Sequence, residues 1–162
     1  MTYAVDKFKQ ASDLYMHGEY TQAKKIFEKL AKKNNMQAQY NLGYLYEHGE
    51  GVEKNAQQAL VWYKKSAKQG YVDAQYNVAT FYFTGKGVKK DVQKALYWYE
   101  EAGKRGDRNA LFNLGTFYAE GKEVEKNKIT AFNYWIESAK RSHVKAQESL
   151  DLLCKESPWA CR

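Results

Sequence analysis

The stretch NLGYLYEHGEGVEKN, residues 41–55, begins with the pattern of an aromatic-rich helix, is interrupted by glycines, and ends on an asparagine. Two similar stretches, NVATFYFTGKGVKKD at 77–91 and NLGTFYAEGKEVEKN at 113–127, follow at a constant spacing of 36 residues without a gap. A fixed period of this length is typical of proteins in which one supersecondary unit is stacked repeatedly. The sequence therefore predicts a repeat architecture.

Each copy has the pattern of two helices joined by a glycine-containing loop. In the first copy, Ala38, Leu42 and Leu45 fall at the i, i+4, i+7 spacing of one apolar helix face. Gly49 can end this helix in a left-handed conformation, and Asn55 can accept hydrogen bonds from the first amides of the next helix. The residues in the place of Asn55 in later copies are Asp91 and Asn127. Because one helical hairpin cannot bury its apolar face alone, we expect stacked hairpins in an all-α fold.

The repeated pattern is A-x-Y-N-L-G-x-L-Y-x-x-G-x-G-V-x-x-(N/D)-x-x-x-A-x-x-W-Y, carried by residues 36–71, 72–107 and 108–143. It resembles the Sel-1-like repeat, a longer relative of the tetratricopeptide repeat, over nearly the whole chain. Glu123 departs from the pattern, because Gly51 and Gly87 hold its place in the other copies, and we expect a different turn there. The resemblance implies a right-handed α-solenoid whose first helices line a concave face, and a role as a protein-interaction adaptor.

The two flanking segments differ from the three full copies. Residues 1–35 are similar to an ordinary tetratricopeptide hairpin, because Ala11 and Ala23 are 12 residues apart whereas Gly43 and Ala59 are 16 apart. Residues 144–162 have the pattern of a capping helix followed by a tail. We expect 1–35, 36–71, 72–107, 108–143 and 144–162 to form one solenoid domain. Gly43, like Gly115 in the third copy, would allow the paired helix to approach closely.

Polar side chains lie outside the apolar face of each first helix. Positions 37, 41, 44 and 48 share one side of the helix, and the later copies repeat this stripe. If the geometry implied by the resemblance holds, the stripes and their aromatic neighbours line the concave groove for a peptide or protein. The candidate partner-binding residues are Gln37, Tyr40, Asn41, Tyr44, His48, Asp73, Tyr76, Asn77, Thr80, Phe83, Thr84, Asn109, Phe112, Asn113, Thr116 and Glu120.

Two sets of repeated residues each have two interpretations. Asn41, Asn77 and Asn113 could form a ladder of amides that holds the backbone of an extended peptide, or could bond to neighbouring hairpins and set the stacking. The aromatic residues of the second helices could form a stacking platform, but their helical spacing beside alanines favours the core. These residues are Trp62, Tyr63, Trp98, Tyr99 and Trp135.

The net charge of +7 does not by itself indicate a nucleic-acid-binding protein. The lysines that recur with the repeat fall at the ends of second helices, where the helix dipole favours a cation. No apolar run approaches the roughly 18 residues of a membrane span, so we expect neither nucleic-acid binding nor membrane insertion. The recurring lysines are Lys32, Lys68, Lys104 and Lys140.

No catalytic or metal-binding constellation stands out. The segments GEGV and GKGV lie between two helices of a repeat, which is not the context of a phosphate-binding loop. His17, His48 and His143 are dispersed, without the spacing of zinc ligands. The sequence therefore predicts no enzyme activity, no metal and no cofactor.

Both cysteines, Cys154 and Cys161, lie in the C-terminal tail. Pro158 can end the last helix and turn the chain back, which favours a disulfide of the kind found in exported proteins. The alternative is two thiols in a reducing cytoplasm. The first residues, MTYAVDKFKQ, lack a signal-peptide pattern. The expected location is periplasmic or otherwise extracytoplasmic, on the strength of the disulfide, with the cytoplasm as the alternative.

We expect a binding module that docks a peptide or protein, as a monomer or in a heterocomplex with its partner. One alternative is an inhibitor or immunity protein that blocks a secreted bacterial toxin, a role that some short Sel-1-like proteins resemble. A second alternative is an enzyme that processes β-lactams or cell-wall fragments. The relatives proposed for that role carry a cysteine pair in each repeat, and all three copies here lack one.

Overall fold

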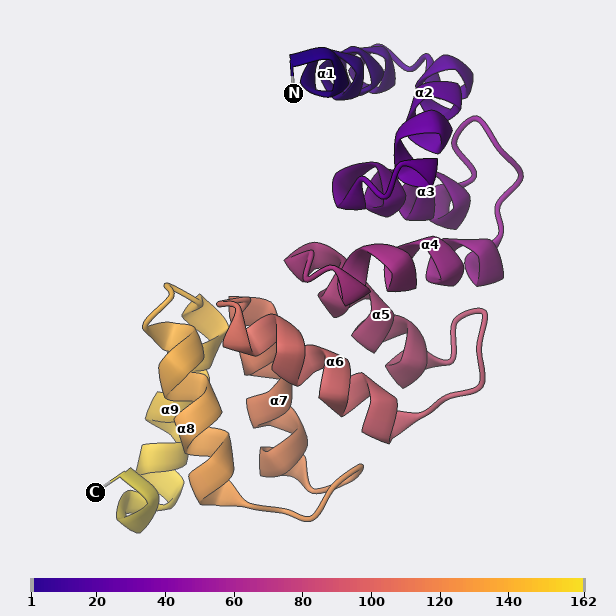
Figure 1. The fold of residues 1–162 in the computed structure, drawn as a ribbon. Coiled ribbons are helices and arrows are strands. Elements are labelled where there is room, and N and C mark those ends of the chain that lie inside the picture. Colours follow the sequence, from indigo (N-terminus) through magenta and orange to yellow (C-terminus); the bar gives the residue numbers. More distant parts are fainter. Residues whose placement is uncertain (1, 162) are drawn as a thin grey trace. The chain divides into compact units, whose positions relative to one another are not determined.

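The computed structural model describes residues 2–161, with side chains described from residue 7 to residue 159. This part of the chain folds into nine α-helices and one short 3-10 helix and contains no strand (Figure 1). The residues form two compact units, Met1–Asp91 and Val92–Arg162. The expectation that all segments form one solenoid domain stays a prediction.

The first unit contains the N-terminal hairpin, the first full repeat and the first helix of the second repeat. Its helices are α1 (Thr2–Met16), α2 (Tyr20–Lys32), α3 (Met36–His48), α4 (Ala56–Lys68) and α5 (Val72–Thr84). Helices next to each other in the sequence pack against each other throughout this unit. Their shared core begins with the apolar faces of α1, α2 and α3, as the period of the sequence predicts.

The second unit contains the second helix of the second repeat, the third repeat and the C-terminal cap. Its elements are α6 (Val92–Lys104), α7 (Arg108–Glu120), α8 (Lys128–Ala139), α9 (Val144–Glu156) and the 3-10 helix η1 (Pro158–Cys161). Helices α7 and α8 form the tight pair of this unit, and α9 packs on α8. The position of α9 confirms the predicted helix after residue 143.

The helix ends follow the predicted capping residues. The Asn55 side chain accepts a hydrogen bond from the Gln58 amide at 2.9 Å, and Asn127 caps α8 in the same way at 2.9 Å. Gly49 ends α3 in the left-handed conformation, with its amide donating to the Leu45 carbonyl. These contacts confirm the prediction of helix starts and stops for the first and third repeats.

Glycines inside first helices allow the paired helix to approach closely. A Cβ atom added to Gly43 would lie 2.5 Å from the Tyr63 ring, and one added to Gly115 would collide with the Trp135 indole. The indole nitrogen of Trp135 also donates to the Phe112 carbonyl at 3.2 Å, which fixes the ring on α7. The predicted role of these two glycines is confirmed.

In the first unit, the loop of each repeat packs closely against the helix pair that precedes it. Gly51, at φ +65°, lies so close to the start of α2 that an added Cβ would be 2.6 Å from the Tyr20 carbonyl carbon. A Cβ added to Gly87 would likewise lie 2.7 Å from the carbonyl carbon of Ala56, at the start of α4. Glu123, by contrast, is not among the residues with positive φ. The third loop therefore adopts a different turn, as its departure from the pattern predicts.

The second-helix aromatics only partly match the core prediction. Tyr63, Tyr99 and Trp135 are buried as expected, whereas Trp62 and Trp98 are half-buried. Consecutive residues of a helix point about 100° apart, so only one residue of each aromatic pair can face the first helix. The expectation that all five are core residues therefore holds for Tyr63, Tyr99 and Trp135, whereas Trp62 lies at the edge of the core and packs against the buried cluster of α1, α2 and α3.

The C-terminal part of the chain contains both cysteines of the predicted disulfide. Cys154 on α9 is disulfide-bonded. The side chain of Cys161, the predicted partner, lies outside the described residues, so their pairing stays a prediction. Ser157 ends α9, and Lys128 at the start of α8 donates to its hydroxyl at 2.6 Å.

Candidate functional site

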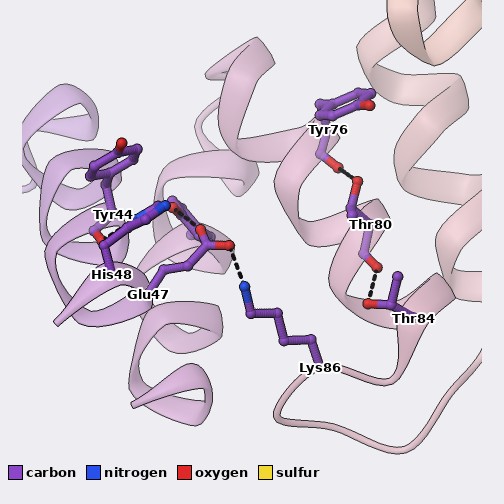
Figure 2. A network of polar contacts seen from close by, with 8 residues as sticks. Tyr44, Glu47, His48, Tyr76, Thr80, Thr84 and Lys86 are labelled. Carbon is purple, nitrogen blue, oxygen red and sulfur yellow. Dashed lines mark hydrogen bonds and ion pairs between the residues drawn. The ribbon is translucent and has the colours of Figure 1, made fainter. Parts of the chain in front are cut away.

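The predicted binding residues of α3 share one side of that helix. Gln37 and His48 are exposed at its two ends, and Asn41 and Tyr44 between them are half-buried. His48 Nδ1 lies 3.0 Å from the Tyr44 carbonyl oxygen, and the two rings stack with centroids 3.9 Å apart (Figure 2). The ring of Tyr15, on α1, meets Tyr44 edge-on at 6.2 Å. The Tyr44 side chain is therefore held in place from two sides.

The stripe on α5 has the same gradient of exposure. Asp73 and Thr84 are exposed at the ends, and Asn77 and Thr80 are half-buried between them. Thr80 Oγ1 donates to the Tyr76 carbonyl at 3.1 Å, and Thr84 Oγ1 donates to the Thr80 carbonyl at 2.8 Å (Figure 2). Because both hydroxyl protons are used within the helix, these threonines offer a partner only methyl groups and acceptor lone pairs.

Tyr40 links α3 to α5. Its ring lies 5.5 Å from that of Tyr63 and 5.0 Å from that of Tyr71. Burial, followed by the charge of Asp73, raises the pKa of Tyr40 to about 12, and a hydrogen bond from Asn77 partly opposes this rise. Asn77 also hydrogen-bonds to the Tyr63 hydroxyl. The Asn77 amide thus holds neighbouring helix pairs together, which is the stacking role named above as the alternative.

Asn41 differs from Asn77. Across the part of the chain that the structure describes, no hydrogen bond engages the Asn41 side chain, which is half-buried on α3. Its amide can therefore still donate to and accept from a bound peptide group. The amide ladder stays a prediction for Asn41, whereas the position of Asn77 supports a structural role.

The third stripe lies on α7, in the second unit. Asn109 and Glu120 are exposed at its ends, and Phe112, Asn113 and Thr116 are half-buried. Thr116 Oγ1 donates to the Phe112 carbonyl at 3.0 Å, repeating the arrangement on α5. Because this stripe belongs to the second compact unit, a single groove across three repeats stays a prediction.

The repeat pattern of the sequence does not predict one polar network, which is centred on Glu47. Glu47 on α3 accepts a hydrogen bond from the Tyr63 hydroxyl at 2.6 Å. It also pairs with Lys86 Nζ at 2.7 Å (Figure 2). This carboxylate joins α3, α4 and the loop after α5. The same position holds Phe83, which is half-buried, and Ala119 in later copies. A search for recurring residues misses Glu47 because its contacts occur in one repeat only.

A second carboxylate lies beside the α3 stripe. Burial and a hydrogen bond to Glu50 raise the pKa of Tyr15. The Oε2 atom of Glu50 is buried and has no hydrogen-bond partner among the described residues. Leaving a buried acceptor unpaired is costly, and a buried water that donates to this oxygen would remove the cost.

His143 caps the N-terminus of α9. Its Nδ1 accepts a hydrogen bond from the Ala146 amide at 3.2 Å, and its ring stacks on Phe112 with centroids 4.6 Å apart. Burial, followed by the charge of Arg108, lowers the pKa of His143. The neutral ring is the form that can accept this capping hydrogen bond.

We expect acidification to destabilise the second unit through His143. A histidine whose pKa is lowered by folding stabilises the protein above its unfolded-state value of 6.5, and this contribution is lost as pH falls through the folded-state value. Losing the cap costs about 1 kcal/mol. Calorimetric unfolding should show a larger fall in Tm from about pH 7 to pH 5 for the native chain than for His143→Asn, which caps without titrating. Parallel curves would assign the pH dependence to other groups.

The recurring lysines are partly neutralised. Lys104 pairs with Glu101 at 2.7 Å and Lys140 with Glu137 at 2.8 Å, each within or at the end of its own helix.

Within the described residues, no group of three or more histidines, cysteines and carboxylates is placed to hold a metal ion. None of the described helices combines the length and apolar character needed to cross a membrane.

Known proteins show the same repeat. The Sel1 repeat model matches residues 37–71, 72–107 and 108–143. Over 54 residues, the chain is 43% identical to the ERAD-associated E3 ubiquitin-protein ligase component HRD3 of Candida glabrata. The aligned residues make up 33% of this chain and 6% of that protein. The match is therefore local.

Two solved structures resemble the chain over nearly its whole length. A Sel1 repeat protein from Oxalobacter formigenes has a TM-score of 0.83 and 34% identity, covering 91% of this chain and 62% of that one. The protective antigen c5321 of uropathogenic Escherichia coli, which displays an SLR fold, has a TM-score of 0.89 and 29% identity, covering 94% of this chain and 34% of that one. The chain thus spans less than two thirds of either structure. Both likenesses confirm the predicted α-solenoid class.

Proposed function

Because the chain belongs to the Sel1 repeat family, whose members generally mediate protein–protein interactions, we propose that it is a docking module that binds a partner protein on α3 and α5. We call this surface the α3–α5 face. It consists of the stripe residues Gln37, Asn41, Tyr44, His48, Asp73, Asn77, Thr80 and Thr84, with the adjacent tyrosines Tyr40 and Tyr76.

Half-buried tyrosines carry the proposal. Tyr40, Tyr44 and Tyr76 lie on α3 and α5, neither buried in the core nor fully exposed. Tyrosine is enriched among the residues that dominate binding energy, because its ring buries a large apolar area and its hydroxyl finds a polar partner. The contacts of Tyr44 with Tyr15 and His48 fix its ring before binding, which reduces the entropy lost on association.

The polar residues around these rings suit the rim of an interface. Gln37, His48, Asp73 and Thr84 are exposed at the ends of the two stripes. Protein interfaces combine a desolvated centre with a polar, solvent-accessible rim. The unengaged Asn41 amide lies between rim and centre, where it could hold a peptide bond of the partner. A hydrogen-bonded peptide backbone is therefore the chemistry that this face suits best.

Site-specific photocrosslinking tests the proposal. A photoreactive amino acid at His48 or Thr84 replaces a residue of the α3–α5 face, whereas one at Val61 or Tyr97, which are 46% and 55% exposed on second helices, replaces none of its residues. In lysate of the cells that make the protein, we expect one partner to crosslink from the first pair at least fivefold more strongly. Equal yields from both pairs, or yields confined to Val61 and Tyr97, would overturn the proposal.

A binding measurement with the identified partner completes the test. We expect Tyr44→Ala to weaken its affinity by tenfold or more, as for an interface residue worth about 2 kcal/mol. Tyr97→Ala is the matched control, because it removes an exposed tyrosine outside the face. Both variants should keep the far-UV circular dichroism of the native chain, so that lost affinity does not reflect unfolding.

A further inference from the structure

A hollow in the second unit is lined by α6, α7 and α8, and we call it the α6–α8 hollow. Its volume is about 360 Å³. Leu111 and Leu114 of α7 and Gly103 of α6 are buried and form its apolar floor. The other lining residues are polar or charged and come from α6 and α8: Glu100, Lys104, Tyr134, Glu137 and Arg141. An apolar floor with a charged rim suits a ligand that is apolar along its length and charged at its end.

The charges of this hollow are paired except at Glu100. Lys104 pairs with Glu101 at 2.7 Å, and Arg141 pairs with Glu137 at 2.9 Å. The Glu100 side chain is half-buried, and no hydrogen bond or ion pair engages its carboxylate among the described residues. The hollow therefore contains one negative charge without a counterion.

The ring of Tyr134 lies near this carboxylate. Burial, followed by the charge of Glu100, raises the pKa of Tyr134. The Tyr134 ring also stacks on that of Tyr118, with centroids 5.9 Å apart, which fixes it at the side of the hollow. An aromatic ring beside an unpaired carboxylate favours a cation, because the face of the ring and the carboxylate both attract positive charge.

The first full repeat shows which group lies at these positions when the chain supplies its own cation. Trp62 and Lys65 of α4 are the repeat equivalents of Tyr134 and Glu137. Lys65 Nζ lies 4.0 Å from the centroid of the Trp62 ring. In the third repeat Glu137 replaces this lysine, so among the described residues the Tyr134 ring lacks the ammonium group that its equivalent has.

A second substitution removes the counterion of the carboxylate. Glu28 of α2, the repeat equivalent of Glu100, pairs with Lys24 at 2.7 Å. In α6 the place of Lys24 is taken by Leu96, which is buried in the core. Two separate replacements, each of which removes a lysine, therefore leave the Glu100 carboxylate and the Tyr134 ring without a cation.

We propose that the α6–α8 hollow receives one lysine side chain of a partner protein. Its methylene groups lie on Leu111 and Leu114, and its ammonium group lies between the Glu100 carboxylate and the Tyr134 ring. Lysine side chains bury their methylene groups on apolar surface in this way while the charged end stays near water. This site shares no residue with the α3–α5 face and does not depend on the function proposed for that face.

The probe is Nα-acetyl-lysine methylamide, titrated into the full chain and followed by NMR. We expect the methyl resonances of Leu111 and Leu114 to shift saturably, while those of Leu42 in the first unit stay unchanged. The Nε-acetylated form of the probe has no charge and should cause no saturable shift. Unchanged Leu111 and Leu114 resonances, or equal shifts with the neutral form, would overturn the proposal.

Two variants with the same change of charge test the role of Glu100. Glu100→Gln should weaken binding of the probe by about fivefold or more, because the ammonium group loses its carboxylate partner. Glu148→Gln is the matched control, because Glu148 is exposed on α9 and does not line the hollow. Equal weakening by the two variants would assign the effect to net charge and contradict the proposal.

Glu137→Lys restores the lysine of the first full repeat. Its ammonium group should lie over the Tyr134 ring as that of Lys65 lies over Trp62, and should weaken binding of the probe by about fivefold or more. Unchanged affinity would show that the probe does not use this ring and would count against the proposed site.

Butylammonium tests the source of the cation. It has the charged alkyl chain of the probe but lacks the peptide groups that a partner protein would supply. We expect it to bind no more tightly than Nα-acetyl-lysine methylamide. Tighter binding of butylammonium would assign the hollow to a small free amine and overturn the proposal of a partner's lysine.

Discussion

Gly51→Ala is expected to destabilise the first unit by about 3 kcal/mol. An L-residue in the left-handed region costs about 1–2 kcal/mol, and overpacking costs typically a further 1–3 kcal/mol. Both costs apply, because Gly51 has φ +65° and its added Cβ would lie 2.6 Å from backbone at Tyr20 and 2.7 Å from backbone at Thr21. Backbone atoms at the start of α2 cannot move aside as a flexible side chain can.

Gly18→Ala separates the two costs. Gly18 has φ +78°, and nothing lies within 4 Å of the Cβ that the substitution would add. This variant should therefore lose only about 1–2 kcal/mol, from backbone strain alone. Chemical denaturation followed by circular dichroism gives both free energies of unfolding, and hydrogen exchange of the α2 and α3 amides locates the loss. Equal losses for the two variants would show that the contact of the loop with α2 contributes nothing.

The difference between these glycines illustrates what a repeat pattern can predict. The period located the hairpins, the capping asparagines and the close contact at Gly43, because each of these recurs and depends on local geometry. It also indicated that Glu123 would alter its loop. The close contact of Gly51 with the start of α2 was not predictable, since it depends on how one repeat packs against the previous one.

The candidate site was less predictable than the fold. Helical spacing predicts that the stripe residues share one side of α3, but it does not predict that the residues at the ends are exposed and those at the centre half-buried. Helical spacing did not show that the Thr80 hydroxyl donates to a carbonyl of its own helix, or that Asn77 hydrogen-bonds to Tyr40 and Tyr63. These outcomes depend on side-chain rotamers and on tertiary neighbours. Glu47 was missed because its partners assemble in one repeat only.

The aromatic pair of α4 provides the other large expected effect. Tyr63→Ala should destabilise the first unit by about 3–5 kcal/mol, as do other removals of a fully buried large aromatic residue. Tyr63 is 0% exposed, and its ring packs against Tyr40 and edge-on against Phe81 at 5.6 Å. Its removal leaves a cavity against Gly43, which has no side chain to fill it. The free energy of unfolding from denaturant titration measures this loss.

Two further substitutions separate the contribution of the Tyr63 ring from those of its hydroxyl and of the neighbouring Trp62. Tyr63→Phe keeps the ring and removes the donor to Glu47, so it should cost only about 1–2 kcal/mol, since Lys86 still pairs with that carboxylate. Trp62→Ala should also cost less than Tyr63→Ala, because Trp62 is half-buried and its ring faces the Lys65 ammonium at 4.0 Å. If Trp62→Ala proved the more damaging change, the assignment of Tyr63 as the core residue of the pair would be wrong. Position 62, and not position 63, would then carry the packing of α4.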